Sequence, residues 1–186
     1  SHQVELFDEE LNKEPYKEIG IKTLKPFPIK NKITIALDQV SKSNEDILSE
    51  GKFPLVLGGE HSITPGSIKP FTRKYEEITL LHFDAHADLR ESYQGEKFSH
   101  ASAIKRCLDH KNVKVVSFGI RNLSQLEMDF YNNNRDRIEI FWGKDKKKWD
   151  LTILDKLFKD KNVYITFDVD GFDASVMPAT GTPEPG

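Results

Sequence analysis

The fold class is decided by the stretch Leu80-Leu81-His82-Phe83-Asp84-Ala85-His86-Ala87-Asp88, in which an apolar run passes directly into spaced carboxylates and imidazoles. Residues 78–83 have the length and composition of a buried strand. Four further apolar runs are interpreted as strands, at 53–57, 113–118, 138–142 and 163–167. Near-continuous apolar runs indicate a parallel sheet with helices on both faces.

Segments with a helical pattern separate these runs. We interpret as helices the segments 31–51, 62–75, 99–110, 124–133 and 150–158. Ser62 is a candidate N-cap, and Ser124 with Glu127 predicts a capping box. Residues 1–30 are charged and contain three prolines, so we expect an irregular segment there. Strands that alternate with helices predict an α/β fold built from βαβ units.

Composition excludes several classes of protein. A chain of 186 residues has the length of one domain. Its 27 basic and 30 acidic residues give a net charge of −3, without the basic stripe typical of nucleic-acid binding. No apolar run approaches the roughly 20 residues of a membrane span. Cys107 stands alone, which excludes an internal disulfide framework and fits a reducing compartment. We therefore expect a soluble, cytoplasmic protein with Cys107 in its core.

Polar residues gather where three of the predicted strands end. Gly58-Gly59-Glu60-His61 follows the first strand, and two glycines there suit a tight turn. Asp84, His86 and Asp88 follow the second, at a spacing that places all three on one face of an extended chain. Asp168 and Asp170 follow the last strand. In open parallel sheets, ligands bind at the carboxyl ends of the strands.

These clustered charges are difficult to explain by structure alone. Two carboxylates ~4 Å apart repel by about 4 kcal/mol at an effective dielectric constant of 20. Neither Asp-rich motif contains a Lys or Arg, whereas two divalent cations would neutralise four Asp side chains. Carboxylate and imidazole ligands without a thiolate favour Mn²⁺ over Zn²⁺. One Asp-x-His-x-Asp motif alone could be a solvated turn, but the three motifs together favour a metal site. His82 is interpreted as a core residue or one behind the ligands, and Asp173 as structural.

The motifs resemble those of the ureohydrolase family of arginases and agmatinases, and agmatinases most closely. The resemblance runs from about residue 31 to the end and rests on Gly58–Ser62, Phe83–Asp88, Ser99-His100, Phe167–Asp173 and Pro178–Gly186. It implies a three-layer α/β/α sandwich with a mostly parallel central sheet. It also implies two Mn²⁺ ions per subunit and assembly into trimers or hexamers.

The resemblance also implies roles for individual residues. One ion would be held by His61, Asp84, Asp88 and Asp168, and the other by Asp84, His86, Asp168 and Asp170. His100 matches the family's proton-shuttle histidine, and Asp88 or His100 would protonate the leaving amine. Thr182 would line the guanidino pocket, and Glu184 would order the same loop.

Two departures from arginase motifs concern the substrate. After Asp88 the chain has Leu89-Arg90-Glu91-Ser92 where arginases have I-N-T-P, and Asn122-Leu123-Ser124 stands where they have D-V-D. Both departures favour a decarboxylated substrate, so the predicted reaction converts agmatine into putrescine and urea, a step of polyamine biosynthesis. Arginase activity, hydrolysis of guanidinobutyrate or formiminoglutamate, and a non-catalytic metal-binding relative stay open.

Two other metal-dependent classes fit the sequence less well. A dinuclear phosphoesterase would need a later G-N-H-[DE] motif, and a single-zinc deacetylase would not need both Asp88 and Asp170. We expect residues 1–186 to form one ureohydrolase-like domain that lacks an N-terminal segment and a C-terminal part of the family fold.

Overall fold

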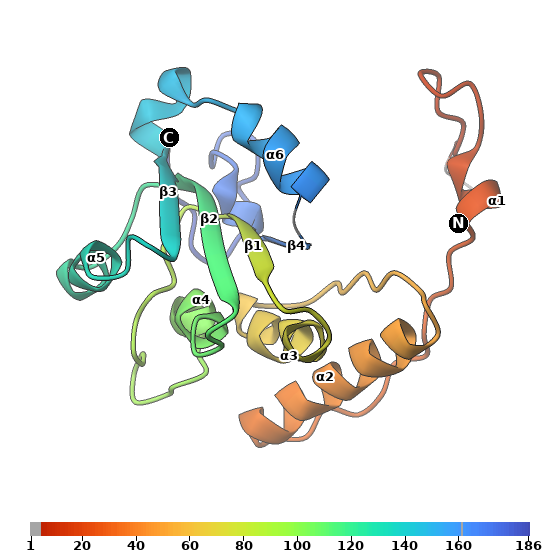
Figure 1. Cartoon of the computed structure of the whole chain (residues 1–186), viewed down its shortest axis with the longest axis horizontal. Helices are drawn as coiled ribbons and strands as arrows, with labels where there is room; N and C mark the ends of the chain where they lie inside the picture. The colour runs from red at the N-terminus through yellow and green to blue at the C-terminus, as the bar shows by residue number, and fades with distance from the viewer. Residues whose placement is uncertain (1–4, 161) are drawn as a thin grey trace.

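Four parallel strands form the centre of the molecule (Figure 1). The computed structural model describes residues 5–160 and 162–186. The strands lie in the order β3-β2-β1-β4, and their bounds are Ile78–Phe83 for β1, Val113–Ile120 for β2, Ile138–Trp142 for β3 and Val163–Phe167 for β4. All three pairings are parallel, as predicted from the apolar runs.

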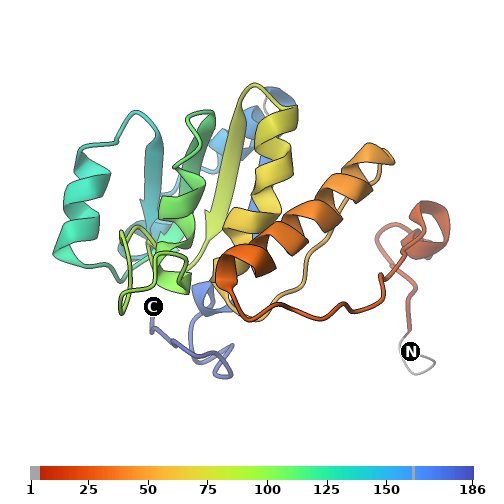
Figure 2. The same cartoon turned by 90° about the horizontal axis from the view of Figure 1, so that it is seen from below.

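Helices cover both faces of the sheet, so the predicted three-layer α/β/α arrangement is confirmed (Figure 1). One face carries α3 (Thr64–Lys74), α4 (Ala103–Cys107) and α5 (Gln125–Asn132). The other face carries α6 (Thr152–Asp160) and Trp149, which follows the 3₁₀ segment η3 (Gly143–Lys148). Helix α2 (Ile33–Ser49) packs on α3, and the segment before it extends away from the body of the molecule (Figure 2).

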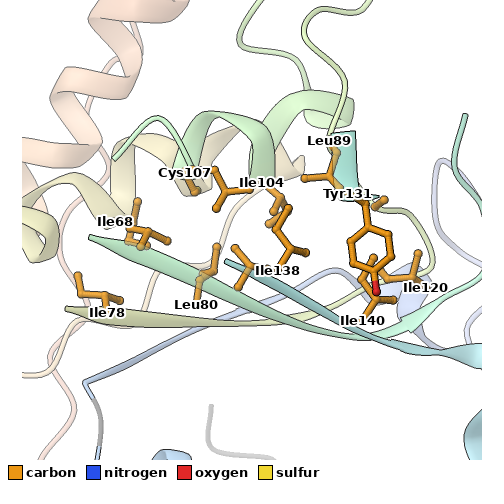
Figure 3. Packing of buried hydrophobic residues seen from close by; sticks show 14 residues of the cluster. Ile68, Ile78, Leu80, Leu89, Ile104, Cys107, Ile120, Tyr131, Ile138 and Ile140 are labelled. Atoms are coloured by element: carbon orange, nitrogen blue, oxygen red, sulfur yellow. The ribbon is translucent and has the colours of Figure 1, made fainter. Parts of the chain in front are cut away.

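Side-chain alternation along β1 divides the core between these two faces. Leu80 points to the larger cluster, where Ile68, Ile104 and Ile138 pack together (Figure 3). Leu81 points to the opposite face, in a cluster with residues of β2, β3 and α6 and with Trp149. Complete burial of one such side chain contributes about 1.5–3 kcal/mol. Cys107 is fully buried in the larger cluster, as the sequence predicted, and this burial raises the pKa of its thiol.

The predicted capping box at the start of α5 is confirmed, and its Glu127 also bonds the chain after Asp88. The Ser124 hydroxyl accepts from the backbone N–H of Glu127, while the Glu127 carboxylate accepts from the backbone N–H of Ser124 at 2.7 Å. The other oxygen of Glu127 accepts from the backbone N–H of Leu89 at 3.0 Å. One buried carboxylate therefore joins α5 to the chain that follows Asp88.

The predicted strand at 53–57 is wrong. This segment lies outside the sheet, and Phe53, Leu55 and Leu57 are 90%, 77% and 88% exposed. A strand needs a hydrogen-bonded neighbour, and among the described residues the sheet ends at β4 without pairing to this segment. The apolar pattern of residues 53–57 indicated a tendency toward burial. It could not show whether a neighbouring strand was present to form hydrogen bonds with this segment.

Three smaller differences concern helix ends. Residues 15–19 form the short helix α1 (Pro15–Ile19) within the segment expected to be irregular, because Pro15 suits the first turn of a helix. Ser62 does not cap α3, since its hydroxyl donates to the Glu60 carboxylate. The helix predicted at 99–110 is shorter and consists of the 3₁₀ turn η2 (His100–Ser102) and α4.

Among the residues with described positions, no helix is both long enough and apolar enough to cross a lipid bilayer.

The packing predicts how two leucine substitutions will differ. Leu80→Ala removes a side chain with 0% exposure, so we expect the free energy of unfolding to fall by about 2–5 kcal/mol. Leu126→Ala on α5 is the matched control, because Leu126 is 80% exposed and its loss should change stability by less than about 0.5 kcal/mol. Urea denaturation followed by circular dichroism measures both. Equal losses would contradict the described packing of β1.

Candidate metal centre

The strand register places carboxylates from distant parts of the chain beside one another. Phe83 of β1 pairs with Phe167 of β4, so the next residues, Asp84 and Asp168, leave adjacent strand ends. The backbone N–H of Asp168 donates to the carbonyl of Phe83 at 2.9 Å, which continues the pairing. A Cβ on Gly171 would lie 3.1 Å from the backbone nitrogen of Asp84, so glycine permits this close approach.

His61 is the centre of a first group of side chains. It lies in the 3₁₀ turn η1 (His61–Ile63), and its Nδ1 is 2.9 Å from carboxylate oxygens of both Asp84 and Asp88. Asp168 approaches the same nitrogen to 3.6 Å. The other ring nitrogen, Nε2, lies 2.9 Å from the hydroxyl of Thr166.

The Nδ1 atom of His61 is buried but has no hydrogen-bond partner. Carboxylate oxygens of Asp84 and Asp88 lie 2.9 Å from this nitrogen, but neither forms a hydrogen bond with it. A buried polar atom without a partner is costly, and a cation among these carboxylates would satisfy it. The donor set therefore fits a metal ion.

His86 is the centre of a second group. Its Nδ1 lies 3.1 Å from an oxygen of Asp170 and 3.6 Å from Asp84. Its Nε2 lies 3.5 Å from the Glu184 carboxylate. Asp84 belongs to both groups and uses a different oxygen toward each histidine.

The backbone at Asp88 is unusual. Its φ is +52°, a left-handed conformation that aspartate adopts more readily than most residues. The carbonyl of Asp88 accepts from the backbone N–H of Lys105 at 3.0 Å, which fixes this turn against α4. Residues in sparsely populated conformations cluster at functional sites, and here the turn directs the carboxylate toward His61.

Burial and charge shift the pKa values of the carboxylates in opposite directions. Burial alone would raise the pKa of Asp84, but contacts with three histidines outweigh burial and hold this pKa well below its ordinary value. Burial raises the pKa of Asp88, and the charge of Asp84 adds to the effect. Burial and the same neighbouring charge also raise the pKa of Asp168. The site therefore holds an excess of negative charge.

The two histidines respond by holding protons more tightly. For His61, burial lowers the pKa, but the contacts with Asp84 and Asp88 outweigh it and raise the pKa to about 10. For His86, the hydrogen bond with Asp170 and the contact with Asp84 raise the pKa to about 10. Without a metal ion, each imidazole is a cation that partly compensates the carboxylates.

Both groups line one cavity of about 600 Å³, together with the other predicted site residues. His100 borders this cavity, and its Nδ1 lies 3.2 Å from the Glu60 carboxylate. The Thr182 hydroxyl, predicted to face a substrate, donates to Asp170 at 2.8 Å. The structure thus brings all eight predicted residues together: His61, Asp84, His86, Asp88, His100, Asp168, Asp170 and Thr182.

His82 lies behind the candidate ligands, which agrees with its interpretation as a residue that supports them. It is fully buried, and its Nε2 is 2.9 Å from Asp84 while its Nδ1 is 3.0 Å from the hydroxyl of Ser117. His61, His82 and Asp84 form one of the groups whose atoms are close enough to bind a cation. Because both nitrogens of His82 already have partners, we assign it to the support of Asp84.

Sequence reasoning did not identify the residues that hold the histidines. Thr166 lies behind His61, Glu60 beside His100, and Glu184 beside His86. Thr166 precedes Asp168 by two residues, so strand alternation could have placed it on the same face. Glu60 stands within the quoted glycine motif, but no local signal linked it to a residue 40 positions away.

Metal binding should stabilise the complete protein. At an Mn²⁺ concentration 100 times Kd, each site adds about 2.7 kcal/mol to the free energy of unfolding. The melting temperature should therefore rise with Mn²⁺ and fall on chelation. Asp84→Asn should abolish this response, whereas Asp145→Asn on the surface segment η3 should keep it. A melting temperature unaffected by chelation would disprove the metal site.

Metal binding should also release protons. Below about pH 10, His61 and His86 are protonated in the metal-free protein, but a ligating imidazole must be neutral. Affinity for Mn²⁺ should therefore increase as pH rises from 6.5 to 9. Calorimetric titration at pH 8 in two buffers with different ionisation enthalpies measures the released protons. Identical heats in both buffers would contradict the proposed ligands.

Comparison with known proteins agrees with this geometry. The model of the Arginase family matches residues 1–186. The N(1)-aminopropylagmatine ureohydrolase of Synechocystis is 34% identical over 199 residues, which cover all of this chain and 62% of that protein. The agmatinase of Bacillus subtilis is 36% identical over 152 residues, covering 81% of this chain and 51% of that protein.

Structural comparison gives the same result. The crystal structure of the agmatine ureohydrolase of Thermoplasma volcanium superposes with a TM-score of 0.84 and 30% identity, over 99% of this chain and 62% of that one. This chain thus spans about half to two thirds of the length of these relatives. The family match over every residue, together with the shared fold, shows that the chain belongs to the arginase family.

Proposed function

We propose that the complete protein is a metal-dependent amidinohydrolase that converts agmatine into putrescine and urea at a centre of two Mn²⁺ ions. The observation that carries this proposal is the pair of histidine–carboxylate groups that share Asp84 within one cavity. The names of the relatives, agmatinase and ureohydrolase, support the same reaction class. Their cleavage of a guanidino or related group needs a strong nucleophile at neutral pH.

The proposed ligands divide into two sets that share the adjacent strand-end carboxylates. One set contains His61, Asp84, Asp88 and Asp168, and the other contains Asp84, His86, Asp168 and Asp170. When bound, divalent ions would lower the pKa of a water molecule from 15.7 toward about 7 and so supply hydroxide. Oxygen and imidazole donors without thiolate suit Mn²⁺.

The protein's own side chains would bind the substrate and transfer protons. The carboxylates around the cavity attract a planar guanidinium cation, and the Thr182 hydroxyl lies at the same wall. His100 is half-exposed at the cavity, so it can exchange protons with bulk water. Because Glu60 contacts Nδ1 of His100, Nε2 is the atom available to deliver a proton to the leaving amine. Asp88 is the alternative donor.

One observation favours a second candidate substrate. Arg90 also borders the cavity, and its Nε lies 3.5 Å from Glu127, whose oxygens already accept from Leu89 and Ser124. Within the described part of the chain, the guanidinium of Arg90 meets Glu127 through Nε and lies over the ring of Tyr93. Its remaining N–H groups suit a carboxylate at the far end of a substrate. A guanidino acid such as guanidinobutyrate would use this contact, whereas agmatine carries an amine there.

Further proposals concern the whole protein. We propose that residues 1–186 belong to a single ureohydrolase domain, which is supported by the family match along the entire chain. Homo-oligomeric assembly as trimers or hexamers stays a prediction from the family resemblance, and a cytoplasmic location stays a prediction from composition.

Urea release by the full-length protein tests the proposed function. With Mn²⁺ present, the rate would be measured with agmatine, arginine and guanidinobutyrate. We expect the highest kcat/KM for agmatine, while a preference for guanidinobutyrate would support the second candidate. Absence of urea from every substrate, despite bound metal, would indicate a non-catalytic relative.

Two variants separate the ligands from the proton carrier. Asp168→Ala should lose metal and activity together, because Asp168 is placed in both ligand sets. His100→Ala should keep both ions yet reduce the rate by roughly 10²–10⁴-fold, and added imidazole should partly restore it. Elemental analysis and urea release would be measured on the same preparations.

Either of two results would overturn the assignment of His100. If His100→Ala loses metal as Asp168→Ala does, the histidine is a ligand. If it keeps both metal and full activity, the histidine has no part in the reaction.

A further inference from the structure

Arg121 occupies a position that the proposed chemistry does not explain. It follows β2 directly and bonds the carbonyl of Gly119 in that strand at 3.1 Å. Its guanidinium also donates to main-chain carbonyls of two segments distant in sequence. Within the first segment it bonds the carbonyls of Asp170 at 2.9 Å, Gly171 at 3.2 Å and Phe172 at 3.1 Å. Within the second it bonds those of Glu184 at 2.7 Å and Pro185 at 3.2 Å.

Both segments carry residues of the same half of the candidate metal centre. Asp170 lies 3.1 Å from His86 and accepts from the hydroxyl of Thr182. Glu184 lies 3.5 Å from the other nitrogen of His86. The guanidinium of Arg121 therefore connects the segment that holds Asp170 to the segment that supports His86.

The backbone around Arg121 completes this connection. The N–H groups of Arg121 and Asn122 both donate to the carbonyl of Ala85, at 2.8 and 3.0 Å. The N–H of Ala85 in turn donates to the carboxylate of Asp170 at 3.2 Å. Asn122 also contacts the Glu184 carboxylate through its side-chain amide. Three segments distant in sequence thus meet at Arg121.

The other half of the centre is held by different contacts. Nε2 of His61 bonds Thr166, and the carbonyl of Asp88 bonds the backbone of Lys105. Among the described residues, the segment that Arg121 bonds reaches the His61 group through Asp168, which accepts from the N–H of Asp170 and lies 3.6 Å from His61. Arg121 itself bonds neither His61 nor Asp88. Loss of Arg121 should therefore affect the two halves unequally.

We propose that Arg121 is a positioning residue for the His86–Asp170 half of the metal centre and has no direct role in the His61–Asp88 half. This inference rests on the proposed two-ion function. Arginine suits the position because its planar group presents five N–H donors in a fixed arrangement. Lysine has three donors around one point charge, so it cannot bond both segments in the same way.

Arg137 offers a matched control. Its guanidinium also bonds main-chain carbonyls, those of Leu108 at 2.9 Å, His110 at 2.8 Å and Val113 at 2.9 Å. It immediately precedes β3, and Val113 begins β2, so this second group of contacts lies at the opposite end of the sheet. Removing either arginine costs several hydrogen bonds, but only Arg121 lies beside the metal centre.

The test is Mn²⁺ binding to the metal-free full-length protein, measured by calorimetry and by electron paramagnetic resonance of the free ion. Wild type should bind two ions per subunit. Arg121→Ala should lower the Mn²⁺ affinity of the His86–Asp170 site 10–100-fold, the usual range for residues that position ligands. The affinity of the His61–Asp88 site should stay within about threefold of wild type. Arg121→Lys should give an affinity at the His86–Asp170 site between those of wild type and Arg121→Ala. Arg137→Ala should lower the melting temperature yet bind both ions with wild-type affinity.

Several outcomes would overturn the inference. It fails if Arg121→Ala binds both ions as wild type does, or if Arg121→Ala and Arg137→Ala weaken both sites alike. If Arg121→Ala does not fold, the Arg121→Lys variant serves as the test. Wild-type Mn²⁺ affinity of Arg121→Lys at both sites would then reject the proposal. Wild type that binds fewer than two ions would reject the two-ion function itself, so the two failures are distinguishable.

Discussion

Parallel pairing between β1 and β4 is the constraint on which the site depends. It aligns Phe83 with Phe167, so Asp84 and Asp168 leave the sheet beside one another. Two such charges ~4 Å apart repel by about 4 kcal/mol at an effective dielectric constant of 20. The sheet is stabilised by its two apolar clusters, and that stability holds the carboxylates together despite their repulsion.

The histidines compensate this repulsion in the absence of metal. His61 and His86 each direct Nδ1 toward the carboxylates and Nε2 toward a supporting side chain, Thr166 or Glu184. Because Nε2 is held by a supporting side chain, the ring keeps its orientation whether Nδ1 carries a proton or binds a metal ion. Exchange of protons for metal ions therefore needs little rearrangement of the described residues. In metalloproteins, such support of ligating histidines is a common determinant of metal affinity.

The central sheet and the gathering of the candidate ligands in one cavity could be predicted from the sequence because their signals are local. Four of the five predicted strands are present, and alternate-residue spacing brought Asp84, His86 and Asp88 together as ligand candidates. The segment 53–57 was predicted wrongly, since an apolar run does not reveal whether a neighbouring strand exists. Arg121 and Glu184 were not assigned to the site, because they meet across 63 positions of the chain.

In the proposed function, substrate choice would depend on a different part of the structure from metal binding. The ligands lie at or near strand ends, whereas Arg90, Tyr93 and His100 reach the cavity from the segment between Asp88 and α4. Glu127 fixes the start of this segment through the backbone of Leu89, and Ala101 accepts from the backbone of Arg90. Loops mounted on a rigid sheet can change without disturbing the residues below them. Differences in this segment could therefore change the distal contact of the substrate while the hydrolytic centre stays the same.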